Sequence, residues 1–385
     1  MKILYVLNSN IRGGMEKHVE DLVKGMLSHN HDVYVWCLRG TISKVYENLG
    51  AKVFTDNAIV FDIDPKYISK LSKFLRENEI DVVHAHELKA VINTLIAGFI
   101  AKTTVKVTHT HTPISEWQTT NVLKKIIWIP TTFFYSFMIN TLSSMEIALT
   151  QSRKKVKMLE GIMSSKLEVI PNTLPAEQFD ISQRSKTLYR NQILKKHDLP
   201  EDAFLFGNIG RITQEKGTDV LVQAFAEFLK HPLNTNKPFY LILVGGGVLE
   251  NYIRDLVYTL GIEKNVIMTG VFEEEDKVKY YSALSVFVFP THAEGFGIVL
   301  MEAMVSELPI ISSDLPVLQE VAQDTVTYFE KGNYLDLAQK MDHVHKQIMD
   351  KSYNVTKAKE LVLQKYSMES FIFSYINLYL RLLAK

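Results

Sequence analysis

The feature that most limits the fold is a regular alternation of short apolar segments with helical patterns along nearly the whole chain. Strand-like runs at 3–7, 33–38 and 105–108 are separated by stretches in which apolar residues recur with helical spacing. Strands that alternate with helices form parallel sheets with helices on both faces. The sequence therefore predicts an α/β fold built from doubly wound parallel sheets.

The alternation occurs in two series, separated by a polar and charged stretch. We expect residues 1–175 to form one Rossmann-like domain, 176–202 to form an inter-domain connection that includes a helix, and 203–365 to form a second Rossmann-like domain. A chain of 385 residues is long for a single hydrophobic core, which agrees with two domains.

The charge balance and the cysteine count limit the partners and the compartment. The 43 basic side chains equal the 43 acidic ones in number, so the chain lacks the basic field that a nucleic acid polymer requires of a partner. The single cysteine, Cys37, excludes an intrachain disulfide framework and indicates a reducing compartment. Residues 2–7 read as a strand and no signal peptide is recognisable, so we expect a cytoplasmic protein.

One uncharged segment, 126–145, requires a choice between two interpretations. It contains Pro130 and Asn140, and its apolar part is short for a bilayer span. We predict a helix buried in the first domain. The alternative is a membrane-facing patch with Lys124 and Lys125 at the lipid headgroups, that is, a peripheral contact with the inner face of the cell membrane.

Ligands of doubly wound sheets bind beyond the carboxyl ends of the strands, which directs attention to the stretch 290–304. A strand at 286–289 is followed by a loop with Glu294 and then by a helical run, a layout that presents backbone N–H groups to an anion. A second carboxylate, Glu302, lies in that helix. The two carboxylates are too far apart to share a proton and suit an extended ligand with hydroxyl groups at both ends. Taken in isolation, Glu302 would be an exposed helix glutamate.

Other loops that follow strands carry cations or glycines. Arg211 and Lys216 flank a helix start, where cations are unfavourable unless an anion such as a diphosphate binds; a solvated pair is the alternative. Gly13-Gly14 and Gly245-x-Gly247 are either tight turns or places where the backbone approaches a ligand.

Two further patterns could hold a metal ion, but we predict none. His109 and His111 could be metal ligands, a polar wall or surface residues. The pair lacks a third and a fourth ligand, since His84 and His86 belong to a different strand. The Asp62-Ile-Asp64 segment precedes Pro65 and a helix, so we interpret it as a helix cap.

Together these motifs resemble those of the retaining glycosyltransferases of family 4, which have the GT-B fold. The most specific is Glu294-Gly-Phe-Gly-x4-Glu302, which is similar to the family's Glu-x7-Glu motif. The other matching elements are Gly13-Gly14, Pro171-Asn172, Gly210-Arg211 with Lys216-Gly217, and Val244-Gly245-x-Gly247. Thr173 departs from the family, which usually has glycine there. The His-x-His pattern is similar to a subgroup involved in bacterial surface polysaccharide assembly.

The resemblance implies a role for each domain. The domain at 1–175, joined by a last helix at 366–385 that crosses back to it, would bind the acceptor. The domain at 203–365 would bind the nucleotide sugar, and the two domains would face each other across a cleft. The acceptor candidates are Arg12, Glu87, His109 and Trp117.

The resemblance also implies roles for single residues. Arg211 and Lys216 would bind the donor diphosphate and replace a metal ion, Glu302 would hold the ribose, and Glu294 would hold hydroxyl groups of the sugar. The transferred sugar would lie beside one histidine, His111 by position or else His109. The predicted catalytic residues are thus His111, Glu294, Arg211 and Lys216. The remaining donor contacts would come from Gly13, Gly14, Gly245 and the backbone of Gly295, Phe296, Gly297, Ile298, Val299 and Leu300.

The implied reaction moves a sugar from a UDP- or GDP-linked donor to a hydroxyl group of a glycan or lipid-linked acceptor. The anomeric configuration would be unchanged, and no cofactor would be needed. The alternatives are a nucleotide-sugar epimerase or a phosphorylase of the same fold, and a non-catalytic subunit of a polysaccharide-assembly complex.

Overall fold

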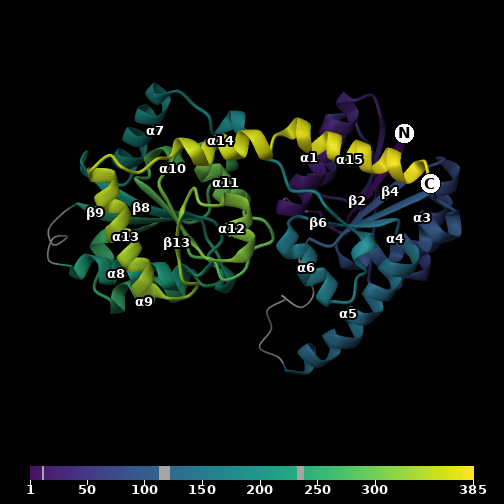
Figure 1. Cartoon of the computed structure of the whole chain (residues 1–385), viewed down its shortest axis with the longest axis horizontal. Helices are drawn as coiled ribbons and strands as arrows, with labels where there is room; N and C mark the ends of the chain where they lie inside the picture. Colours follow the sequence, from purple (N-terminus) through teal and green to yellow (C-terminus); the bar gives the residue numbers. More distant parts are fainter. Residues whose placement is uncertain (11–12, 112–121, 232–237) are drawn as a thin grey trace. The chain divides into compact units, whose positions relative to one another are not determined.

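The computed structural model describes residues 1–10, 13–111, 122–231 and 238–385, and of residues 122–129 it describes only the backbone (Figure 1). The chain divides into two compact units. Unit 1 consists of 1–173 and 368–385, and unit 2 consists of 174–367. Each unit is a parallel sheet with helices, so the predicted pair of doubly wound α/β sheets is confirmed.

Unit 1 contains a seven-stranded parallel sheet in the order β3-β2-β1-β4-β5-β6-β7. Its strands are β1 (Lys2–Val6), β2 (Asp32–Leu38), β3 (Lys52–Asp56), β4 (Val82–His86), β5 (Val105–His109), β6 (Met145–Ala148) and β7 (Leu167–Val169). Its helices are α1 (Gly14–Ser28), α2 (Thr41–Leu49), α3 (Pro65–Glu77), α4 (Leu88–Ala101), α5 (Val122–Leu142), α6 (Gln151–Leu159) and α15 (Met368–Leu383).

Alternate residues of β1, an inner strand of the sheet of unit 1, enter two different cores. Ile3 and Tyr5 pack with residues of α1, α2 and α15, whereas Leu4 and Val6 pack with residues of α3, α4 and α5. Successive side chains of a strand point to opposite faces, so helices on both faces make the buried positions of β1, Ile3 to Val6, apolar. This is why the buried strands appear as continuous apolar runs in the sequence.

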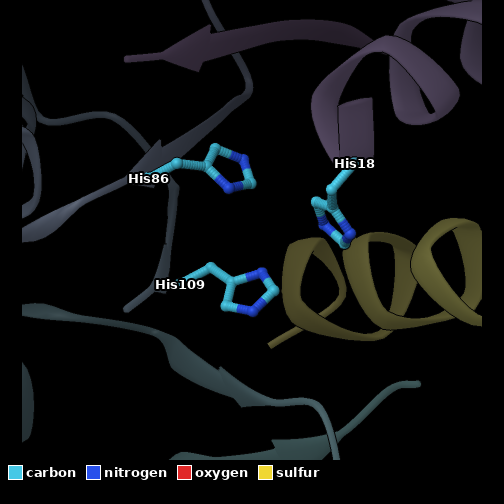
Figure 2. Close-up of side chains that lie close together, drawn as sticks. All are labelled: His18, His86 and His109. Atoms are coloured by element: carbon cyan, nitrogen blue, oxygen red, sulfur yellow. The ribbon is translucent and has the colours of Figure 1, made fainter. Parts of the chain in front are cut away.

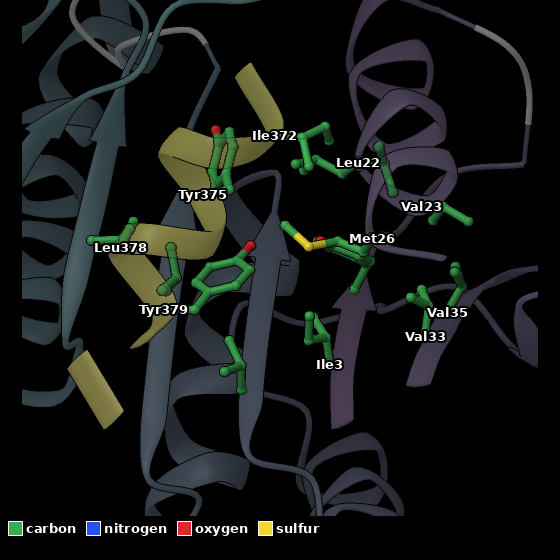
Figure 3. Close-up of a cluster of buried hydrophobic side chains, with 14 of the residues drawn as sticks. Ile3, Leu22, Val23, Met26, Val33, Val35, Ile372, Tyr375, Leu378 and Tyr379 are labelled. Carbon is green, nitrogen blue, oxygen red and sulfur yellow. The ribbon is translucent and has the colours of Figure 1, made fainter. Parts of the chain in front are cut away.

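The last helix of the chain, α15, packs on α1 in unit 1, as the predicted fold requires (Figure 3). Its buried face carries Ile372, Tyr375, Leu378 and Tyr379. The two helices approach closely at Gly25, where an added Cβ would lie 2.0 Å from Cδ1 of Ile372. A larger residue at position 25 would therefore push the helices apart.

Unit 2 contains a six-stranded parallel sheet in the order β10-β9-β8-β11-β12-β13. Its strands are β8 (Phe204–Ile209), β9 (Phe239–Val244), β10 (Val266–Met268), β11 (Val286–Phe289), β12 (Ile310–Ser313) and β13 (Thr327–Phe329). Its helices are α7 (Gln183–Lys196), α8 (Thr218–Lys230), α9 (Glu250–Thr259), α10 (Lys277–Ala283), α11 (Ile298–Val305), α12 (Pro316–Ala322), α13 (Tyr334–Met349) and α14 (Thr356–Lys365).

Residues 176–202, which we expected to connect two domains, lie within unit 2. Their helix, α7, packs against α10, and Arg190 donates a hydrogen bond to the backbone carbonyl of Ala203 over 2.6 Å. The polar composition of the segment fits a surface helix of unit 2.

The uncharged segment forms α5, with Pro130 inside the helix. Tyr135 and Ile139 are buried, but Phe133 and Phe137 are 75% and 57% exposed. The prediction of a helix is confirmed, whereas the prediction that it is buried is wrong for one face. Within the described part of the chain, every helix is too short or too polar to cross a membrane.

Candidate functional site

The loops after β8 and β11 lie against each other in unit 2. Thr291 donates its hydroxyl hydrogen to the backbone carbonyl of Glu215 over 2.8 Å, and the backbone N–H of His292 donates to the same carbonyl over 2.8 Å. A Cβ on Gly217 would lie 2.1 Å from the backbone oxygen of Pro290. The glycine in the Lys-Gly pair is thus required for the contact between the two loops.

This contact brings Lys216 and Glu294, two predicted catalytic residues, together. The Lys216 Nζ atom is 2.9 Å from Glu294 Oε1, and the two side chains are 19% and 16% exposed. An ammonium group has three N–H donors, so Lys216 keeps donors for a ligand while it holds Glu294. The pair presents a cation and a carboxylate at the carboxyl edge of the sheet.

Helix α11 begins directly after this loop. Gly297 is its N-cap residue with φ of 96°, a left-handed conformation that favours glycine. Of the predicted backbone contacts, the N–H groups of Ile298 and Val299 belong to the first turn, where an α-helix provides no partner. The N–H of Leu300 donates to the Gly297 carbonyl, and the N–H of Gly295 donates to Glu294 Oε2 over 3.2 Å. The side chains of Phe296 and Leu300 are buried, so only their backbones could meet a ligand.

Arg211 lies at the carboxyl end of β8 with a side chain that is 76% exposed. Its Nη2 atom is 3.4 Å from Glu215 Oε1. A surface ion pair of this length contributes little, so the guanidinium group is available to an anion.

Glu302 is buried, with 4% of its surface exposed, so the interpretation as an exposed helix glutamate is wrong. Lys277 Nζ lies 2.9 Å from its Oε1 atom, and the Tyr281 hydroxyl group donates to Oε2 over 2.8 Å. Burial raises the pKa of Glu302 and outweighs the opposing effect of Lys277. Lys277 and Tyr281 were not among the predicted site residues, because nothing in their local sequence pattern indicates a buried carboxylate partner.

The glycine loop after β9 is explained by contacts within unit 2. A Cβ on Gly245 would lie 2.0 Å from the Gly210 carbonyl oxygen, and one on Gly247 would lie 2.3 Å from that of Ile212. These glycines allow the loop after β9 to lie against the loop that carries Arg211. This contact favours the tight-turn interpretation, and a contact of Gly245 with a ligand stays a prediction.

A cavity of about 620 Å³ also lies in unit 2, lined among others by Lys186, Arg190 and Tyr281. None of the predicted donor-binding residues lines it. The candidate donor site is therefore defined by the loops after β8 and β11, not by this cavity.

In unit 1 the two glycines at the start of α1 are exposed. Gly13 is the N-cap residue of α1, and Gly14 is its first residue. Glu87 is the N-cap residue of α4, where its carboxylate accepts a hydrogen bond from the backbone N–H of Ala90 over 3.3 Å. The cap contact gives Glu87 a structural role in addition to its predicted role in binding the acceptor. Arg12 and Trp117 lie outside the described residues.

Five histidines gather in unit 1: His18, His84, His86, His109 and His111. His86 Nδ1 lies 3.2 Å from His111 Nε2, and the rings of His109 and His111 stack with centroids 3.8 Å apart. His18 Nδ1 lies 2.7 Å from the side-chain oxygen of Asn172. Burial is the main cause that lowers the pKa of all five imidazoles, so they are uncharged at neutral pH.

His18, His86 and His109 also have the residue types of a metal site (Figure 2). Each offers one nitrogen, and these atoms lie within 4.8 Å of one another. Imidazole nitrogens on a tetrahedral ion are roughly 3.4 Å apart, a separation that falls within this limit. That His86 belongs to another strand does not separate it from His109, so this reason for predicting no metal site is wrong. The strands β4 and β5 are neighbours with His86 in register with His109.

The cap interpretation of Asp64 is confirmed. Its carboxylate accepts hydrogen bonds from the backbone N–H groups of Lys66 and Tyr67 at the start of α3.

Two family models match the chain. The model for glycosyltransferase family 4 matches residues 12–178, and the model for glycosyl transferases group 1 matches residues 190–359. A crystal structure of HepE from Anabaena in complex with UDP is similar over 98% of this chain and 99% of that one, with a TM-score of 0.83 and 19% identity. That likeness shows the GT-B fold. The two models together cover most of the chain, which is a family-4-like glycosyltransferase with the GT-B fold.

Several curated relatives are similar in sequence. An uncharacterised glycosyltransferase of Methanocaldococcus jannaschii is 31% identical over 56% of this chain and 54% of its own length. The capsular polysaccharide biosynthesis glycosyltransferase CapM of Staphylococcus aureus is 32% identical over 46% of this chain and 45% of its own length. The O-antigen biosynthesis glycosyltransferase WclY of Escherichia coli is 22% identical over 93% of this chain and 96% of its own length. The chain thus spans about half the length of the first two relatives and nearly all of the third.

Proposed function

We propose that this glycosyltransferase moves a sugar from a UDP- or GDP-linked donor to a hydroxyl group of a glycan or lipid-linked acceptor, with retention of configuration and without a metal ion. The observation that carries the proposal is the ion pair between Lys216 and Glu294 beside the first turn of α11. A helix N-terminus with an adjacent ammonium group suits a phosphate, and a carboxylate beside it suits the hydroxyl groups of a sugar.

In the proposed reaction, the bond between the anomeric carbon and the diphosphate oxygen breaks. The acceptor hydroxyl oxygen bonds to that carbon on the same face of the sugar. Its proton passes to an oxygen of the leaving diphosphate. Lys216 and Arg211 stabilise the negative charge that develops on the diphosphate, which is the work that a metal ion performs in other transferases.

Glu302 is proposed to hold the ribose of the donor. Its carboxylate is already bonded to Lys277 and Tyr281, so a diol would share oxygens that these side chains also use. A carboxylate has about four lone-pair positions, which leaves acceptors for two hydroxyl groups. The roles predicted for Gly13, Gly14 and His111 stay part of the proposal.

The names of CapM and WclY support a product in surface polysaccharide biosynthesis.

A peripheral membrane contact is proposed on α5. Phe133 and Phe137 are exposed on this helix, and so is Leu159 at the end of α6. The two helices meet where Ser136 donates a hydrogen bond to the backbone carbonyl of Glu160 over 2.6 Å. Exposed aromatic and aliphatic side chains suit the boundary of a bilayer.

The test mixes the purified protein with UDP- and GDP-sugars, with and without extracts of lipid-linked glycans, in buffer that contains a chelator. A transferase releases nucleoside diphosphate together with a glycosylated product, and NMR of that product gives the anomeric configuration. A changed donor sugar without any acceptor would indicate an epimerase. Loss of turnover on chelation would reject metal independence and point to the cluster of His18, His86 and His109. No response to any donor would reject the proposal.

A further inference from the structure

A charged pair lies completely inside unit 1, outside the residues that the proposed reaction uses. Glu146 on β6 is 0% exposed, and Lys157 on α6 is 2% exposed. The Lys157 ammonium group contacts Glu146 Oε1 directly. Removing two charges from water costs more than a simple pair recovers, so a pair in this position requires an explanation.

The pair binds every polar group of one residue, Thr110. Lys157 Nζ donates to the Thr110 carbonyl oxygen and to its Oγ1 atom, each over 2.8 Å. The backbone N–H of Thr110 donates to Glu146 Oε1 over 3.0 Å, and the Thr110 hydroxyl group lies 2.6 Å from the same oxygen. A further bond joins Lys157 Nζ to the Ile147 carbonyl over 2.8 Å, which ties the ammonium group to β6.

Thr110 is the residue between His109 and His111, at the point where β5 has ended. Beyond that point, in the described part of the segment, the backbone has no hydrogen bonds to a neighbouring strand. The buried pair supplies hydrogen bonds to Thr110 in their place. Within the described residues, neither ring nitrogen of His109 has a hydrogen-bond partner. The direction of its ring is therefore set by packing and by the backbone that the pair holds.

The pair is poorly arranged for stability alone. Glu146 Oε2 is buried and has no hydrogen-bond partner among the described residues. Replacing such pairs by apolar residues is often neutral or stabilising. Burial is the largest cause that lowers the pKa of His109 and His111, and the charge of Lys157 lowers both further.

We propose that Lys157 and Glu146 are positioning residues, which fix the backbone of Thr110 and thereby aim His109 and His111 for sugar transfer. This inference rests on the proposed function, in which one of these histidines lies beside the transferred sugar.

The test uses the double variant Lys157→Met/Glu146→Leu, which removes both charges and leaves no unpaired one. We expect its kcat to fall at least about 10-fold, because the histidines lose their alignment. The KM for the donor and the affinity for nucleoside diphosphate should stay unchanged. The proposed contacts of Arg211, Lys216 and Glu302 with the nucleotide are in unit 2, and the variant leaves Gly13 and Gly14 in place. The variant Lys157→Arg, which keeps the charge, should retain more of the turnover than Lys157→Met.

The matched control is Asn93→Leu, another buried polar residue of unit 1, which binds the backbones of Asp64, Asp62 and Lys89. It should lower the melting temperature and leave kcat at 20 °C unchanged. A double variant with the kcat of the wild-type protein, or with a loss no larger than that of Asn93→Leu, would overturn the inference.

A second readout separates this inference from the proposed function. If the wild-type protein transfers no sugar, the proposed function fails, and crystal structures of both proteins still test the positioning role. The inference expects the stacked rings of His109 and His111 to change direction in the double variant. Unchanged rings would overturn it.

Discussion

At the scale of single residues, the charged side chains of the candidate donor site are themselves bound by other polar side chains. Lys216 has Glu294 as its partner, and Glu302 has Lys277 and Tyr281. The spacing of Glu294 and Glu302 indicated an extended polar ligand. It could not indicate that one carboxylate is half-buried beside a lysine and that the other lies inside the protein, because their partners come from other elements.

Replacing Lys216 by alanine should reduce kcat/KM by a factor of roughly 10²–10³, since a donor to developing charge is lost. Thermal unfolding should change little, because Glu294 keeps its bond to the N–H of Gly295. Turnover and the melting temperature would be measured together. The control is Lys340→Ala, a surface lysine of α13 that is 3.9 Å from Asp336. Full activity of the Lys216→Ala variant would contradict the proposed role of Lys216 at the diphosphate.

Glu302 should make the stability of unit 2 depend on pH. Its pKa is raised in the folded state, so the folded state binds the proton more tightly than the unfolded state does. The stabilising contribution is complete below its ordinary pKa of 4.5 and is lost as the pH rises through the raised value. Urea unfolding at pH 5 to 7 should show wild-type protein losing stability relative to Glu302→Gln as the pH rises. Parallel curves for the two proteins would refute this coupling.

At the scale of elements, α5 shows the limits of a local pattern. Its uncharged sequence predicted a helix, and it is one, but Tyr135 packs on α4 while Phe133 and Phe137 face outward. Whether an apolar side chain is buried depends on which neighbours cover it. The helix alone did not contain that information.

If α5 contacts a membrane, Phe133→Ser/Phe137→Ser should reduce sedimentation with vesicles of mixed neutral and anionic lipid at least several-fold. The two rings are exposed, so the fold should be unaffected. The matched control is Phe373→Ser on α15, an exposed phenylalanine of the same unit. Equal loss of binding in the control, or unchanged binding in the double variant, would argue against a specific contact of α5.

At the scale of the whole molecule, unit 1 is built from two separate parts of the chain, and the whole of unit 2 lies between them in the sequence. Helix α15 supplies large buried side chains to the core that α1 and β1 begin. The aromatic composition of 368–383 suggested a packed helix, and the resemblance to family 4 suggested where it would pack. The contact with Gly25 came from the structure.

A chain that ends at Ser367 should therefore lose the fold of unit 1. The truncation removes seven buried side chains, worth roughly 1.5–3 kcal/mol each. They are Phe371, Ile372, Tyr375, Ile376, Leu378, Tyr379 and Leu382. That sum is comparable to the total stability of a domain. Calorimetry should show the transition of unit 2 retained and that of unit 1 missing. Two normal transitions in the truncated protein would mean that α15 is dispensable.

The sequence by itself determined the fold class, the two series of strands and helices, and the loops that carry the candidate donor site. These are local properties: apolar periodicity, glycines in loops that follow strands, and charged residues at helix starts. The tertiary structure alone decided which buried groups meet. The sheet order places β4 beside β5 and α1 over them, which gathers histidines from three distant segments, and it places Lys157 and Glu146 under Thr110. Such pairs depend on contacts between residues far apart in the chain, and no local pattern contains them.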